Sequence, residues 1–108
     1  TVTVSVKFEK APTLDELRAA FEEFTGSPQE QELPSAPKSP IVYLNAEDRP
    51  QPRLDAQRGH GMTVSIGRLR ECKVLDIRFV ALGHNTVRGA AGAAVLNAEL
   101  LYSQGLLS

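Results

Sequence analysis

The sequence predicts an α+β domain in which a mixed, largely antiparallel sheet carries helices on one face. Three segments, 1–8, 62–71 and 75–82, alternate apolar and polar residues with the period of two that is typical of strands. Two further segments, 13–26 and 85–105, show the composition and end signals of helices. The resulting order is strand, helix, loop with a short strand, two strands and a final helix.

The first strand is predicted from four apolar residues that alternate with polar ones over the first eight positions: Val2, Val4, Val6 and Phe8. This alternation indicates one buried face and one wetter face. The pattern starts at the first residue, with no methionine or lead-in before it. We therefore expect the chain to be a piece of a longer protein.

The first helix is predicted to begin at Thr13, because Thr13 and Glu16 have the spacing of a capping box. Pro12 ends the preceding strand. Four apolar residues then follow at helical spacing and share one face: Leu14, Leu17, Phe21 and Phe24. Gly26 is expected to end this helix.

The segment 27–58 holds six of the seven prolines of the chain. Proline removes backbone donors and favours extended conformations, so we expect a long ordered excursion without helix, apart from a short strand at 41–44. One interpretation is a solvated loop whose mixed charges form local ion pairs. The other is a subunit-contact arm, because a stiff segment loses less entropy when it packs on a neighbour.

The segments 62–71 and 75–82 are predicted to form an antiparallel hairpin joined by the polar turn around Cys72. Gly67 interrupts the alternation of the first strand, which indicates a β-bulge. The far end of the second strand is apolar on both faces and is therefore expected to be more deeply buried.

The final helix is predicted to begin at Asn85 and to end at Gly105. Gly89 and Gly92 inside it cost about 1 kcal/mol each relative to alanine, so we expect another backbone or a ligand to approach closely there. The helix is apolar nearly all round, which is typical of a buried helix. Because a chain of 108 residues has little else to bury it with, we expect it to dock on something outside the chain.

Length and composition indicate one domain, and a net charge of −1 gives no electrostatic reason to expect nucleic acid or a membrane surface as a partner. The single cysteine excludes an internal disulfide and suits a cytoplasmic protein. The longest apolar run is glycine-rich and is interrupted by Asn97 and Glu99, which argues against a membrane span.

Few residues have the surroundings that catalysis requires. Cys72 lies at a hairpin turn with no histidine near it in the sequence, so we interpret it as a structural thiol. His60 follows Arg53 and Asp55 and lies in a Gly-His-Gly turn, where an exposed turn histidine is favoured over an acid–base role. His60 and His84 are too few for a zinc site, and we predict no bound metal.

Asn85 is the stronger candidate for a binding residue. It stands where a buried strand ends and a glycine-rich helix begins, and its amide can both donate and accept a hydrogen bond, as recognition of a carboxamide or a base edge requires. The alternative is an ordinary N-cap. The residues alone leave both interpretations open.

Four segments together resemble aspartate-semialdehyde dehydrogenase, in the branch shared by fungi and archaea: LPSAP (33–37), RPQPRLD (49–55), VSIGRLRE (64–71) and HNTVRGAAGAAVLNAELL (84–101). The opening strand looks like the one that follows the family's Arg-Val-Pro…Gly-His segment. The resemblance implies that residues 1–84 are the second half of a substrate and dimerisation domain of the glyceraldehyde-3-phosphate-dehydrogenase type. It implies that residues 85–108 form a helix that returns to the nucleotide-binding domain.

The activity implied by this resemblance is NADPH-dependent reductive dephosphorylation of L-aspartyl 4-phosphate to L-aspartate 4-semialdehyde. The family's catalytic cysteine, histidine and substrate-binding arginine fall before residue 1. The resemblance therefore assigns no catalytic residue within this chain, and Cys72, His60 and Arg53 do not take those roles. Asn85 matches the family's polar residue near the nicotinamide end of NADP, and Thr86 is its neighbour. The implied partners are a small-molecule substrate, the rest of the parent chain and further copies in a dimer or tetramer.

Two alternatives remain beside this interpretation. One is a fragment of a sister acyl-phosphate or acyl-thioester reductase with the same fold and a different substrate. The other is a non-catalytic dimerisation module, which the apolar strand faces and the proline-rich segment favour.

Overall fold

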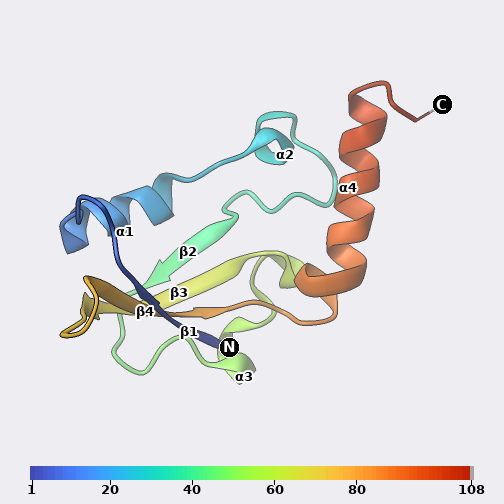
Figure 1. The fold of residues 1–108 in the computed structure, drawn as a ribbon. Helices are drawn as coiled ribbons and strands as arrows, with labels where there is room; N and C mark the ends of the chain where they lie inside the picture. The colour runs from blue at the N-terminus through green and yellow to red at the C-terminus, as the bar shows by residue number, and fades with distance from the viewer. Residues whose placement is uncertain (108) are drawn as a thin grey trace.

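The computed structural model describes residues 1–107, which form a four-stranded sheet with the strand order β1-β4-β3-β2 (Figure 1). The strands are β1 (Val2–Val6), β2 (Ile41–Leu44), β3 (Val64–Glu71) and β4 (Ile77–Leu82). β4 pairs antiparallel with β1 and β3, whereas β2 runs parallel to β3. The α+β class, the mixed and largely antiparallel sheet, the hairpin and the short strand at 41–44 are confirmed.

Within residues 1–107, six helical segments accompany the sheet: α1 (Leu14–Glu23), α2 (Ser27–Glu30), α3 (Pro52–Asp55), the 3-10 helix η1 (Arg58–Gly61), the π-helical turn η2 (Val87–Ala91) and α4 (Gly92–Ser103). The expectation that 27–58 is free of helix is wrong, because α2 and α3 lie within it. Pro28 and Pro52 each stand in the first turn of these short helices. The missing N–H of proline costs no intrahelical bond there.

The predicted capping box opens α1. The backbone N–H of Glu16 donates to Thr13 Oγ1 at 3.1 Å, and the backbone N–H of Thr13 donates to Glu16 Oε2 at 2.9 Å. The helix ends at Glu23, earlier than predicted, because Phe24 is already extended; Gly26 instead precedes α2.

α1 covers one face of the sheet over β2 and β3 (Figure 1). The ring of Phe21 meets Phe79 of β4 edge to face, with centroids 5.3 Å apart. The Arg18 guanidinium lies 4.7 Å from the ring centroid of Tyr43 on β2. Such contacts add to burial of the apolar helix face and hold α1 on the sheet.

The opposite face of β3 is covered by the loop before α3. A Cβ atom on Gly67 would lie 2.3 Å from the carbonyl oxygen of Arg49, so only glycine allows this approach. The pairing of β3 with β4 shifts register between Gly67 and Arg70, and Arg68 has a positive φ of 55°. The bulge predicted at Gly67 is confirmed.

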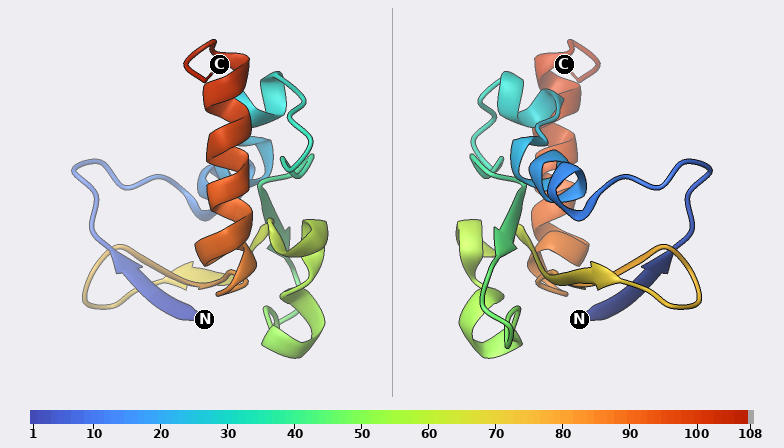
Figure 2. Two further views of the ribbon diagram at one scale, coloured as in Figure 1. Left: turned by 90° about the vertical axis from the view of Figure 1, so that its right-hand side faces the viewer. Right: turned by 90° about the vertical axis from the view of Figure 1, so that its left-hand side faces the viewer.

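α4 stands at one end of the sheet beside α2 and does not lie on a sheet face (Figures 1 and 2). Leu96 of α4 is buried against Leu33 and Met62. Ser35 donates through its backbone N–H and its hydroxyl to the two carboxylate oxygens of Glu99, at 2.9 and 2.7 Å. These contacts attach the inner side of α4 to the segment 33–37.

The helix stop near Gly105 is confirmed. Gly105 has a φ of 74°, its N–H donates to the carbonyl of Tyr102, and the N–H of Leu106 donates to the carbonyl of Leu101. These two bonds form a Schellman motif, which satisfies carbonyls at the end of the helix.

The outer side of α4 is an uncovered apolar stripe. Its members are exposed and follow one another at helical spacing on one face: Ala91, Ala94, Val95, Ala98, Leu101 and Tyr102. Leu96 is the only buried residue of α4. The chain therefore leaves the outer side of α4 unburied, as expected. That this side docks on something outside the chain remains a prediction. Within residues 1–107 every helix is too short or too polar to cross a membrane.

The two helix glycines differ in their surroundings and provide a matched test. A Cβ on Gly92 would lie 2.5 Å from Met62 Sδ and 2.9 Å from the Val87 carbonyl oxygen, whereas the nearest atom to a Cβ on Gly89 is 3.6 Å away. We predict that Gly92→Ala destabilises the chain by about 1–3 kcal/mol through overpacking. Gly89→Ala should be neutral or stabilising by up to about 1 kcal/mol. Urea unfolding followed by circular dichroism measures both, and equal effects would contradict this account.

Candidate functional site

The candidate site begins at the junction between β4 and η2, at residues 84–86. The backbone N–H of Val87 donates to His84 Nδ1 at 3.2 Å, and Thr86 Oγ1 lies 3.4 Å from the same nitrogen. His84 thus caps the first turn. The interpretation of Asn85 as the N-cap is wrong, because the imidazole one residue earlier already accepts this N–H.

Asn85 and Thr86 present exposed side chains at this junction. Within residues 1–107 the Asn85 amide makes no side-chain hydrogen bond, which leaves its donors and acceptor available to a ligand. The regular helix begins only at Gly92, after the π-helical turn in which Gly89 N–H bonds to the His84 carbonyl at 3.0 Å. Single π-helical turns are frequent at functional sites.

η1 packs directly against this junction. Gly59, His60 and Gly61 all have positive φ, at 57°, 55° and 82°. A Cβ on Gly61 would lie 3.1 Å from Val87 Cβ and 3.4 Å from His84 Cδ2, so η1 approaches Val87 and the His84 ring closely. His60 itself is exposed, as the turn-histidine interpretation predicts.

A groove of about 930 Å³ lies beside the junction, between the segment 34–39, η1 and the start of α4. This volume is in the range of small-molecule sites. Most of its lining is apolar, and its two fully charged residues, Lys38 and Arg58, are both basic. Val87 and Val95 line it, which joins the groove to the junction and to the apolar stripe of α4, whereas Asn85 and Thr86 lie outside its lining.

Asp55 forms the electrostatic centre behind η1. Its side chain is 0% exposed and accepts from Arg49 Nε at 2.8 Å and Arg49 Nη2, from the Gln51 backbone N–H at 2.7 Å and from Arg58 Nε at 3.0 Å. The hydrogen bonds from Arg49 first, and then those from Gln51 and Arg58, hold the pKa of this carboxyl far below its ordinary value although burial opposes the shift. Its carboxylate is therefore charged under all ordinary conditions.

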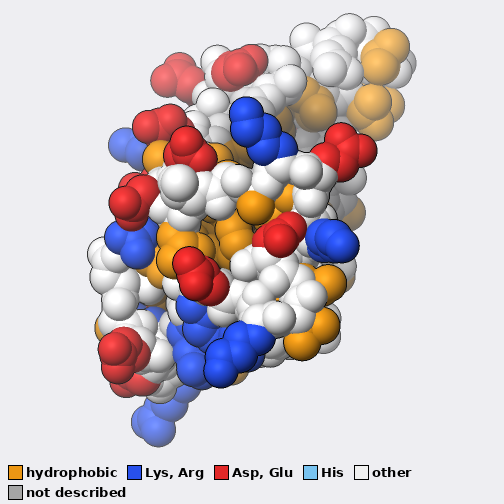
Figure 3. Space-filling model, turned by 60° about the vertical axis from the view of Figure 1, so that its left-hand side comes forward, with side chains coloured by type: hydrophobic (Ala, Val, Ile, Leu, Met, Phe, Trp, Pro, Cys, Tyr) orange, Lys and Arg blue, Asp and Glu red, His pale blue; other side chains and the backbone are white. Residues whose placement is uncertain are grey.

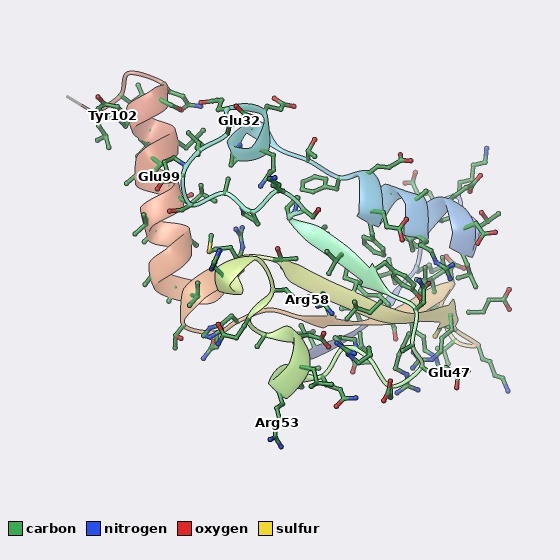
Figure 4. The ribbon with its side chains drawn as sticks, turned by 180° about the vertical axis from the view of Figure 1, so that it is seen from behind. Glu32, Glu47, Arg53, Arg58, Glu99 and Tyr102 are labelled. Atoms are coloured by element: carbon green, nitrogen blue, oxygen red, sulfur yellow. The ribbon has the colours of Figure 1, made fainter. Side chains whose placement is uncertain are left out.

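This buried carboxylate is not singled out by the sequence. The mixed charges of 27–58 predict local ion pairs, but as features of a solvated loop. The available signal is the arginines on either side of Asp55 in sequence, which could have indicated a shared partner. Figure 4 shows the contrast between two of them: Arg53 points away from the molecule, and Arg58 lies inward beside β3.

Cys72 lies at the predicted turn between β3 and β4 and is half-buried. The backbone N–H groups of Leu75, with its nitrogen 3.4 Å from Sγ, and of Val74 lower the pKa of the thiol, although burial opposes this. Leu75 and Val74 both belong to the turn itself. Among residues 1–107, no group of three or more histidine, cysteine or acidic side chains could hold a metal ion.

Charged side chains of both signs lie over the surface, with hydrophobic side chains visible between them (Figure 3). On the sheet, Arg70 stands opposite Arg78 in the antiparallel register. Burial first, and then the charges of Arg78 and Arg68, lower the pKa of Arg70. Like charges facing each other across strands are unfavourable, and both salt bridges within residues 1–107 use Asp55 and not this group.

Comparison with known proteins places these features in a family. A family model described as semialdehyde dehydrogenase, dimerisation domain, matches residues 1–88. Aspartate-semialdehyde dehydrogenase from Methanothermobacter thermautotrophicus is 47% identical over 103 residues, which are 94% of this chain and 30% of that protein. The enzyme of the same name from Schizosaccharomyces pombe is 47% identical over 107 residues, covering 96% of this chain and 30% of that protein.

Two further relatives bear on the cofactor and the substrate. The crystal structure of aspartate-semialdehyde dehydrogenase with NADP from Candida albicans superposes with a TM-score of 0.87 at 40% identity, covering 97% of this chain and 30% of that one. Malonyl CoA reductase (NADP) from Metallosphaera sedula is 43% identical over 104 residues, which are 94% of this chain and 29% of that protein. The chain thus spans about 30% of the length of the curated relatives it matches.

The buried Asp55 predicts a specific acid sensitivity. Removing one partner of a buried ion pair costs about 3–5 kcal/mol, so Asp55→Asn should destabilise the chain by about 3 kcal/mol at neutral pH. Because the pKa of Asp55 is lowered by folding, its contribution is complete above about pH 4, the ordinary carboxyl range, and is lost as the pH falls below it. Urea unfolding between about pH 7 and about pH 2 should show a smaller acid loss for Asp55→Asn than for the wild type. Glu47→Gln, an exposed carboxylate in the same loop, is the control and should keep the wild-type profile.

Proposed function

Because this chain belongs to the family of semialdehyde dehydrogenase dimerisation domains, we propose that it is the C-terminal part of an aspartate-semialdehyde dehydrogenase. The proposed reaction is reduction of L-aspartyl 4-phosphate by NADPH to L-aspartate 4-semialdehyde with release of phosphate. The observation that carries the proposal is the likeness to the Candida albicans enzyme with NADP along 97% of the chain. Relatives that bear this enzyme's name and match at 40–47% identity support it.

In the parent enzyme this chain would bind and position the cofactor, without supplying a catalytic side chain. Asn85 and Thr86 are proposed to contact the nicotinamide end of the cofactor, which in its reduced form, NADPH, supplies the hydride. The exposed and unengaged Asn85 amide fits this role, because a carboxamide presents one acceptor and two donors to it. The Thr86 hydroxyl can donate or accept beside it.

The apolar stripe of α4 is proposed to pack on the nucleotide-binding domain of the parent. Its small residues Ala91, Ala94 and Ala98 allow close approach, and Val95, Leu101 and Tyr102 supply apolar area. This packing would carry the junction at 84–86 to the cofactor. It supports a division between a sheet unit, 1–84, and a returning segment, 85–108, of which Ser108 lies outside the described residues.

The sheet is proposed to join copies of the parent enzyme. The description of the matching family as a dimerisation domain supports a homo-oligomer. Sedimentation of the parent enzyme would distinguish a dimer from a tetramer, and a monomer would contradict the proposal. The other proposed partners are the remainder of the parent chain and the small-molecule substrate. The proposed location of the parent enzyme is the cytoplasm.

A second candidate function is reduction of an acyl thioester, favoured by the 43% identity to malonyl CoA reductase (NADP). Assays of the purified parent enzyme with L-aspartate 4-semialdehyde and phosphate, and separately with malonyl CoA and NADPH, distinguish the two. Loss of both activities would favour a non-catalytic dimerisation module. The 108-residue chain alone is expected to be inactive in both assays.

Asn85→Ala tests the proposed cofactor contact. Loss of one or two net hydrogen bonds of about 1 kcal/mol each should raise the KM for NADP by roughly 5- to 30-fold in the parent enzyme. Asn97→Ala removes the same side chain from an exposed position on α4 and should leave the KM unchanged. Steady-state kinetics measure both, and an unchanged KM in Asn85→Ala would count against the contact.

Ala98→Glu tests the docking of α4. Burial of an unpaired carboxylate in the proposed contact should lower the melting temperature of the parent enzyme by several degrees, at a cost of about 3 kcal/mol or more. Asn97→Glu adds the same charge one residue away, beside the stripe, and should change the melting temperature little. If the two variants melt alike, the stripe is not buried in the parent.

A further inference from the structure

We propose that His84 is a positioning residue that holds Asn85 and Thr86 in their binding conformation through an unprotonated Nδ1, and that protonation of this imidazole releases them. The inference rests on the proposed function, because it assumes that Asn85 and Thr86 meet the cofactor. It adds a residue and a pH-sensitive element to that site.

The proton state of the ring follows from its hydrogen bonds. The backbone N–H of Val87 can only donate, and it points at His84 Nδ1 over 3.2 Å. Thr86 Oγ1, also a potential donor, lies 3.4 Å from the same atom. Acceptance of the Val87 N–H requires a lone pair on Nδ1, and we infer from it the neutral ring with its proton on Nε2.

His84 accepts two hydrogen bonds from the following turn. Its ring accepts from Val87, and its carbonyl accepts from the backbone N–H of Gly89 at 3.0 Å. Asn85 and Thr86 lie between His84 and these two anchor points, so the bonds restrict their backbone dihedrals. Gly61 lies near the ring as well, because a Cβ added to it would be 3.4 Å from His84 Cδ2. These bonds constrain the backbone from which the Asn85 and Thr86 side chains project.

Protonation would replace this acceptor with a second donor. An N–H at Nδ1 would face the N–H of Val87. The hydrogen bond between them would be lost, and the two donors would repel each other. The ionisable groups on the elements packed against the ring are Arg88 on η2 and Arg58 and His60 on η1. All three are basic, so none offers a carboxylate to compensate the new charge.

A pair of substitutions in the parent enzyme separates the acceptor from the ring. In His84→Asn the amide oxygen takes the position of Nδ1, keeps an acceptor for Val87 and does not titrate. In His84→Gln the amide is one bond further from the backbone and cannot take that position. His84→Asn should keep the KM for NADP within about twofold of the wild type at neutral pH, and His84→Gln should raise it about tenfold, with a smaller effect on kcat.

The pH dependence gives a readout that a purely structural role would not move. On acidification from neutral pH, the KM for NADP of the wild type should rise more steeply than that of His84→Asn. The inference is overturned if the two profiles coincide, or if His84→Gln and His84→Asn have the same KM. If Asn85→Ala leaves the KM unchanged, the proposed function fails; if it raises the KM and His84→Gln does not, only the role of His84 fails.

Hydrogen exchange tests the cap without any variant. In the wild-type parent enzyme, the protection factor of the Val87 amide should fall about tenfold more on acidification than that of the Leu106 amide, which bonds to the Leu101 carbonyl. The Leu106 bond has no titratable acceptor and serves as the internal control. Parallel changes at both amides would overturn the proposal even if His84→Gln did not fold.

Discussion

The buried carboxylate of Asp55 is the interaction on which the arrangement of the site depends. Through Arg49 it fixes the loop whose carbonyl presses on Gly67 of β3, and through Arg58 it fixes the start of η1. η1 in turn places Gly61 against His84 and Val87. A single buried charge, stabilised by four donated hydrogen bonds, thus connects the back of the sheet to the junction at 84–86.

The elements that the sequence predicted well are those whose information is local. The capping box at Thr13, the alternation of the strands and the glycine stop near residue 105 each depend on residues only a few positions apart. The short helices in the proline-rich segment were missed because the rule against proline applies to the interior of a helix and not to its first turn. Whether a helix can form there depends on the position of each proline within it, which the composition of the segment does not show.

The site was only partly predictable for a related reason. Asn85 was found because it follows a buried strand, but its capping role passed to His84, and sequence spacing does not reveal which side chain reaches the N–H of Val87. Likewise, Gly92 is required by the sulfur of Met62, thirty positions earlier in the chain, and Gly89 is not crowded at all. Both glycines look alike in the sequence, and only the packing tells them apart.

The position of β1 in the strand order has a consequence for handling the chain by itself. β1 lies at the edge of the sheet, and Val2–Val6 contains no charge, proline or bulge, the devices that natural edge strands use against unwanted pairing. Its free row of backbone donors and acceptors is a template for another strand. An isolated preparation would therefore tend to associate edge to edge through residues 2–6.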